Sequence, residues 1–226
     1  MFELILAAAF FVGIHVLIAG SRLRDHLVAP IGESLFRAVF SAISVFGLWW
    51  LVTSFRAAPY IETWGPLTWF KPIAAVLMLL AFLLVITGLT TKNPAAVAGE
   101  SALTESQAAH GILRITRHPF LWGLAIWAFT HVVANGDLAA LVLFGSLLAL
   151  CLVGTRSIDA KRQRIYGTAW DRFAAATSNL PFQAILQGRN QLRLAEIGWL
   201  RVGAGVLLYA GMLHAHLKLF GVSPLF

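Results

Sequence analysis

The chain has 226 residues, of which 59% are apolar and only 12% are charged. That charged share is about half of the usual ~25% of a soluble domain, and the mean hydropathy is +0.79. A water-soluble globule and a disordered chain are therefore excluded. The single cysteine, Cys151, excludes an internal disulfide and a thiolate cluster. We expect one all-α integral membrane domain over residues 1–226.

Six apolar runs predict a six-helix transmembrane bundle, because a bilayer core needs about 20 residues of helix per crossing. Taken in chain order, the runs cover Phe2–Gly20, Leu35–Phe55, Pro72–Leu89, Pro119–Ala134, Leu138–Thr155 and Ile197–Phe220. The fourth run is the shortest. Between the fourth and fifth runs stands Asn135-Gly136-Asp137. This link predicts a tight antiparallel hairpin, because glycine can end one helix and aspartate can cap the next.

The basic residues indicate the orientation of the bundle. The chain carries 17 Lys and Arg against 10 Asp and Glu, a net charge of +7. With six spans both termini lie on one side, and on that side we find only Arg56, Lys71 and Lys218. The positive-inside rule then predicts cytoplasmic loops and periplasmic termini in a bacterial inner membrane. In such a chain the positive excess indicates lipid headgroups as partners before nucleic acid.

The long connection over residues 156–196 is expected to be a cytoplasmic loop with a basic amphipathic helix on the membrane surface. Lys and Arg alternate there with apolar residues at helical spacing. The apolar residues are Ile158, Ile165, Tyr166, Trp170 and Phe173. A charged extension of the fifth span explains the same pattern equally well.

Four histidines fall inside predicted spans, where polar groups are costly and commonly functional. They are His15, His131, His214 and His216. Imidazole can ligate a metal, relay a proton or hydrogen-bond a neighbouring helix, and the sequence alone leaves these roles open. Because a bundle brings side chains of different helices together, two of them could share a haem or a metal ion.

A second concentration of polar groups lies at the start of the fourth span. Arg114 and Arg117 are about one helical turn apart and His118 follows, so several donors meet where helix N–H groups also point outward. An anion such as a carboxylate, a phosphate or a haem propionate could bind there. Alternatively, the arginines anchor the helix among the headgroups. Motifs of ATPases, metalloproteases and serine hydrolases are absent from the sequence.

The segment GILRITRHPFLWGLAIW, residues 111–127, is followed by His131 and by Asn135-Gly136-Asp137. Together with Gly13-Ile14-His15 and residues 21–24, it resembles the NnrU family of bacterial membrane proteins. That resemblance spans most of the chain. It implies a part in denitrification and nitric oxide metabolism.

The same pattern is similar to that of the related zeta-carotene isomerases, which carry haem b and isomerise a cis double bond. This similarity implies a redox-regulated cis-trans isomerase of a lipophilic substrate. It implies His15 and His131 as axial ligands of haem b, with His118 as an alternative. Arg114 and Arg117 are then the candidate partners of the haem propionates.

Arg117-His118-Pro119 also resembles the RHP motif of membrane methyltransferases of the isoprenylcysteine carboxyl methyltransferase type. This resemblance implies S-adenosylmethionine as cofactor, although Leu121 stands where those enzymes have tyrosine. Asp159-Ala160 stands where their acidic pair is expected. A third function, a non-enzymatic membrane assembly factor with structural histidines, also stays open.

Overall fold

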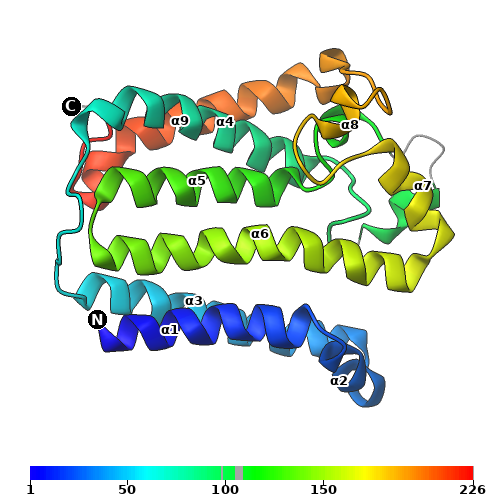
Figure 1. Cartoon of the computed structure of the whole chain (residues 1–226), viewed down its shortest axis with the longest axis horizontal. Helices are drawn as coiled ribbons and strands as arrows, with labels where there is room; N and C mark the ends of the chain where they lie inside the picture. The colour runs from blue at the N-terminus through cyan, green and yellow to red at the C-terminus, as the bar shows by residue number, and fades with distance from the viewer. Residues whose placement is uncertain (98, 105–108, 226) are drawn as a thin grey trace.

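The computed structural model describes residues 1–97, 99–104 and 109–225 and is built from helices (Figure 1). Successive long helices run antiparallel to one another, and both termini lie at the same end. The helices are α1 (Phe2–Gly13), continued by the π-helical turn η1 (Ile14–Ala19), α2 (Leu23–Ile31), α3 (Glu33–Ala57), α4 (Lys71–Thr90), α5 (Pro119–Asn135), α6 (Leu138–Tyr166), α7 (Thr168–Ala176), α8 (Gln183–Leu186) and α9 (Trp199–Phe220). Short 3-10 turns are η2 (Thr68–Phe70), η3 (Glu100–Thr104), η4 (Gly111–Arg114) and η5 (Leu194–Ile197).

Within the described residues, five helical segments are long and apolar enough to cross a membrane, and each coincides with a predicted span. They are Phe2–Ala19, Glu33–Ala57, Thr68–Thr90, Leu138–Tyr166 and Trp199–Phe220. The predicted fourth span corresponds to α5, which has 17 residues and is therefore about 25 Å long. Helix α5 packs along both α4 and α6 (Figure 1). The all-α membrane fold is thus confirmed, whereas α5 as a sixth crossing stays a prediction.

One apolar core joins α1, α3, α5 and α6. Leu4 and Leu51 are fully buried in it, with Phe11, Leu143 and Phe144 beside them. Helix α9 contributes little to a core, because it packs mainly on α4 and leaves Leu200 and Leu207 91% and 73% exposed. Such continuous apolar exposure on a helix long enough to span a bilayer is the surface that lipid covers.

The predicted surface helix within residues 156–196 takes a different form. Helix α6 continues without a break to Tyr166, so residues 156–166 extend the fifth span, as the alternative interpretation expects. A separate short helix, α7, follows. Its Trp170 and Phe173 are only 2% and 4% exposed, and they pack against Ile112 and Leu113. These two apolar side chains face the protein itself, so they are not part of a membrane-facing surface.

The terminal end of the bundle is held by the connection between α3 and α4. The backbone N–H groups of residues 63–65 all donate to the carbonyl oxygen of Gly136, at 2.9 to 3.2 Å, and the Thr63 hydroxyl donates to it at 2.6 Å. Gly136 has φ +63, and Asp137 accepts the N–H of Ala140 at 2.9 Å. The predicted hairpin with a glycine end and an aspartate cap is confirmed.

Candidate functional site

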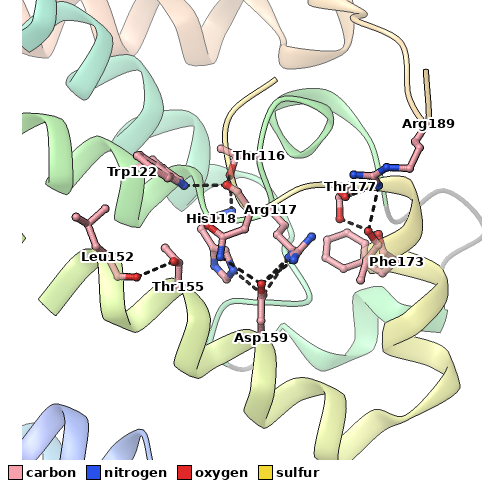
Figure 2. Close-up of polar contacts among 12 residues, drawn as sticks. Thr116, Arg117, His118, Trp122, Leu152, Thr155, Asp159, Phe173, Thr177 and Arg189 are labelled. Carbon is pink, nitrogen blue, oxygen red and sulfur yellow. Dashed lines mark hydrogen bonds and ion pairs between the residues drawn. The ribbon is translucent and has the colours of Figure 1, made fainter. Parts of the chain in front are cut away.

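A single carboxylate organises the polar groups at the loop end of the bundle. Asp159, on α6, accepts both Arg117 Nε and Nη2, at 2.9 Å to Oδ1 and 2.7 Å to Oδ2 (Figure 2). His118 lies on the same carboxylate, with its Nε2 2.7 Å from Oδ1. Asn179 adds a longer contact of 3.3 Å. Because an ionised carboxylate only accepts hydrogen bonds, the proton of His118 is on Nε2.

The chain around Pro119 explains how the arginine and the histidine reach that carboxylate. Pro119 is the first residue of α5, a position that needs no N–H donor. Just before it, the His118 N–H donates to Thr116 Oγ1 at 3.2 Å, and that hydroxyl donates to the Asn179 carbonyl at 2.6 Å. Trp122 Nε1 donates to the same carbonyl at 2.8 Å (Figure 2). The segment is therefore tied to residues 177–179 and to α6 at once.

These contacts bear on the predicted roles of Arg117 and His118. The Arg117 side chain is 14% exposed and its guanidinium is already neutralised by Asp159. A haem propionate at Arg117 would have to displace that carboxylate. His118 is 3% exposed and donates its Nε2–H to Asp159, so Nδ1 is the nitrogen that carries its lone pair.

Arg114, the other candidate anion-binding residue, is also paired within the protein. Its Nε and Nη2 donate to the two oxygens of Glu196 at 2.7 and 3.0 Å, and Nη1 donates to Asn190 at 2.6 Å. Glu196 also accepts the Gly111 N–H at 3.0 Å. Hydrogen bonds from Arg114 hold the pKa of Glu196 at about 2, against a smaller opposing effect of burial.

His131 lies in a different environment, among aromatic rings on α5. Its ring centroid is 4.7 Å from that of Phe144 and 5.0 Å from that of Trp127. Nδ1 is 2.8 Å from the Trp127 carbonyl oxygen, which can only accept, so Nδ1 carries the proton. Nε2 then presents a lone pair. Nothing in the part of the chain that the structure describes hydrogen-bonds to it.

His15, at the π-helical end of the first span, repeats this arrangement. Its Nδ1 donates to the Phe11 carbonyl at 2.7 Å, and its ring packs against Phe11 and Phe40. Across the described residues, its Nε2 likewise has no hydrogen-bond partner. Histidines that ligate metals are commonly oriented by such an Nδ1–H bond to a carbonyl. The donor chemistry of both imidazoles therefore fits the iron of a haem.

Helix α6 runs parallel to α1 (Figure 1). Residue positions along α6 can therefore be used to compare the depths of the two histidines in the bundle. Ser157 donates to the Gly20 carbonyl at 3.0 Å, which sets these two residues at one level. Phe144, beside His131, stands thirteen residues before Ser157, about 20 Å. His15 stands five residues before Gly20, about 8 Å. The backbone levels thus differ by roughly 12 Å, whereas an imidazole–metal bond is about 2 Å.

The two imidazoles consequently do not meet at one point at these backbone levels. No group of three or more His, Cys, Asp or Glu able to hold a metal is found in residues 1–97, 99–104 and 109–225. On α9, His216 donates Nδ1–H to the Val222 carbonyl at 2.8 Å and packs on Phe220. It belongs to the terminal end of the chain.

An apolar cavity of about 220 Å³ lies between α4 and α5. Its lining is formed by Met78, Ala81, Phe82, Val85, Leu124 and Trp127. It offers almost no polar surface, so it suits part of a lipophilic molecule rather than a charged one. Trp127 connects the cavity to His131, because its ring packs against the imidazole and its carbonyl accepts the Nδ1–H.

Taken together, these features define a helical membrane protein with an ion-paired loop end and an apolar, histidine-bearing interior. A model of the family described as NnrU protein matches residues 3–224, and the chain belongs to this family.

Two curated relatives show a shorter similarity. The chain is 37% identical over 82 residues to the chloroplastic 15-cis-zeta-carotene isomerase of Zea mays and 35% identical over 82 residues to that of Arabidopsis thaliana. In each case the match covers 36% of this chain and 22% of the relative. The chain thus matches less than a quarter of the length of these relatives. No solved structure matches the chain.

Proposed function

We propose that the protein is a membrane-embedded cis-trans isomerase of a lipophilic substrate that uses haem b. The observation that carries this proposal is that His15 and His131, both partly buried among aromatic rings, each have Nδ1 fixed by a carbonyl and Nε2 unengaged. Family membership and the similarity to two isomerases support the reaction class. The cavity beside Trp127 supports the nature of the substrate.

In this proposal His15 and His131 would hold the haem iron through Nε2, which requires their backbone levels, roughly 12 Å apart in this structure, to converge. When bound, haem b would supply a redox-active iron that can interact with a double bond or with nitric oxide. The carbonyls of Phe11 and Trp127 fix the tautomer, so that the lone pair stays on Nε2. The aromatic and aliphatic wall at Trp127 and Phe82 would position an apolar chain and exclude water.

The proposal includes the place of the protein in the cell. We propose a bacterial inner membrane, with the Asp159 end in the cytoplasm and both termini in the periplasm. The basic loops at the Asp159 end and the common end of the termini support this orientation. Ligation of nitric oxide by the ferrous protein would provide the link to nitric oxide metabolism.

The experiment is an isomerisation assay with haem-loaded protein in liposomes. A 15-cis polyene is added under reducing conditions, and the cis and trans products are separated by chromatography. We expect conversion by the wild type and at least a hundredfold lower rate in His131→Ala and His15→Ala, because each removes a ligand. His26→Ala is the matched control, since this histidine is exposed on α2 at the loop end and should leave the rate unchanged.

Two results would contradict the proposal. The first is a colourless protein from haem-replete cells that converts no cis polyene. If that protein binds S-adenosylmethionine, the methyltransferase interpretation is favoured, and without such binding the assembly-factor interpretation is favoured. The second is a wild-type rate in both histidine variants.

A further inference from the structure

A cluster of charged side chains at the loop end joins α2, the start of α3 and the end of α6. Arg24 donates to Glu33 at 2.5 Å, and Arg37 donates to the same carboxylate at 2.6 Å. On the other side, Arg164 donates to Asp25 at 2.9 Å. The Arg24 contact connects α2 with α3 and the Arg164 contact connects α6 with α2, whereas the Arg37 contact lies within α3.

Lys161 stands within this cluster and distinguishes it from an ordinary ion-pair network. The side chain is partly buried and interacts electrostatically with Arg24, Arg162, Asp25 and Glu33. In the described part of the chain, no side chain or backbone group hydrogen-bonds or ion-pairs with its ammonium. Both carboxylates nearby are already committed to arginines. A partly buried, unpaired cation is costly, so the site favours an added anion.

The charge balance supports the same conclusion. Glu33 is paired with Arg24 and Arg37, and Asp25 is paired with Arg164, so Lys161 adds its positive charge beside carboxylates that are already neutralised. Cationic pockets between transmembrane helices at the cytoplasmic side are typical binding sites of anionic headgroups.

The outer face of α2 indicates what kind of anion fits. Leu23, Leu27 and Ile31 recur every four residues, are 47%, 39% and 44% exposed, and form one stripe. None of the residues of α2 is buried in the protein. A short helix with one apolar stripe and charged residues beside it is typical of a helix in the bilayer interface. The apolar stripe suits acyl chains, next to a cationic group that suits a phosphate.

We infer that the α2, α3 and α6 cluster binds the phosphate of an anionic phospholipid, with Lys161 as its principal ligand. Lys161 supplies the unpaired charge, Arg24 and Arg164 raise the local positive potential, and the α2 stripe contacts the acyl chains. This site is separate from the histidines and from the cavity at Trp127. It does not depend on the proposed enzymatic function.

Native mass spectrometry of the delipidated full chain tests this inference. Phosphatidylglycerol, phosphatidylcholine and inorganic phosphate are titrated separately. We expect one tightly retained phosphatidylglycerol, which Lys161→Gln weakens by roughly fivefold, the effect of one interfacial cation, and which Lys161→Arg retains. Lys218→Gln, at the terminal end, is the control that should match the wild type.

The other outcomes have defined meanings. Equal phosphatidylglycerol affinity in Lys161→Gln and Lys218→Gln would overturn the inference. Equal retention of phosphatidylcholine would also overturn it, because the headgroup charge would then be irrelevant. Competition by millimolar inorganic phosphate without any lipid preference would assign the site to free phosphate. If Lys161→Gln does not fold, Lys161→Arg and Lys161→Met provide the comparison. Wild-type binding of phosphatidylglycerol by Lys161→Arg and no binding by Lys161→Met would support the need for a positive charge.

Discussion

The loop end around Asp159 and the apolar interior around His15 and His131 use their polar groups in opposite ways. At the loop end, Arg117 and His118 share one carboxylate, which pairs the arginine and orients the imidazole. In the interior, each imidazole has one nitrogen fixed by a backbone carbonyl and the other left open. The comparison indicates that ion pairs hold the loop end, whereas the proposed chemistry uses the interior.

The largest expected effect on stability comes from Asp159→Asn. Neutralising this carboxylate leaves the largely buried Arg117 without its counter-charge, and breaking such a pair costs roughly 3–5 kcal/mol. Thermal unfolding in detergent micelles measures the loss. Asp171→Asn, at an exposed position of α7, is the control and should stay within about 0.5 kcal/mol. An Asp159→Asn variant that is as stable as the wild type would contradict the stabilising role of the loop end.

The terminal end offers a test of a region held by backbone contacts rather than by charges. Gly136→Ala places a Cβ 2.0 Å from the Gly65 carbonyl oxygen at a residue with φ +63. We expect a loss of about 2–3 kcal/mol in unfolding free energy. Gly145→Ala is the matched substitution, because its Cβ meets only Leu141 at 3.9 Å. Similar unfolding temperatures for the two variants would contradict the packing described for Gly136.

A smaller effect is expected from Glu196→Gln, and it should depend on pH. The folded pKa of Glu196 is about 2, below its ordinary value of 4.5, so the carboxylate stabilises the fold above pH 4.5. That stabilisation is lost as the pH falls from about 4.5 towards 2. Glu196→Gln should therefore be less stable than the wild type near neutral pH and approach it near pH 2. A difference in stability between Glu196→Gln and the wild type that stays constant at all pH values would contradict the pairing of Arg114 with Glu196.

The smallest effect on stability is expected for His131→Gln, the variant for which we expect loss of isomerisation. His131→Gln removes a hydrogen bond to a carbonyl within its own helix and no ion pair. We expect a change below about 1 kcal/mol in unfolding free energy, together with loss of isomerisation. Unfolding curves and the isomerisation assay on the same preparation measure both. Loss of folding in His131→Gln would instead assign this histidine to the structure.

The sequence predicted the helices because a long apolar run in a bilayer must satisfy its backbone hydrogen bonds internally, as a helix does. It did not predict the pairing of Arg117 with Asp159, which are 42 residues apart, one just before α5 and the other on α6. The one available signal was a lone acidic residue in the basic end of α6. Trp170 and Phe173 were predicted to face a membrane surface, because an amphipathic pattern looks the same whether lipid or protein covers it.

The candidate site was predicted in part. The positions of His15 and His131 inside helices followed from hydropathy, and the carbonyl partners of their Nδ1 atoms are found only in the structure. Their difference in depth follows from the level at which α1 packs on α6, which is set by contacts such as that of Ser157 with Gly20. No local pattern of residues in the sequence specifies the position along α6 at which α1 packs.

The most direct test of the central claim is a haem titration of the purified protein, followed by Soret absorbance and by its shift on reduction. We predict saturable binding of haem by the wild type and by His118→Ala, and greatly weakened binding by His15→Ala and by His131→Ala. Loss of the Soret band in His118→Ala with retention in both other variants would contradict the account, because the ion-paired end and not the open imidazoles would then hold the iron.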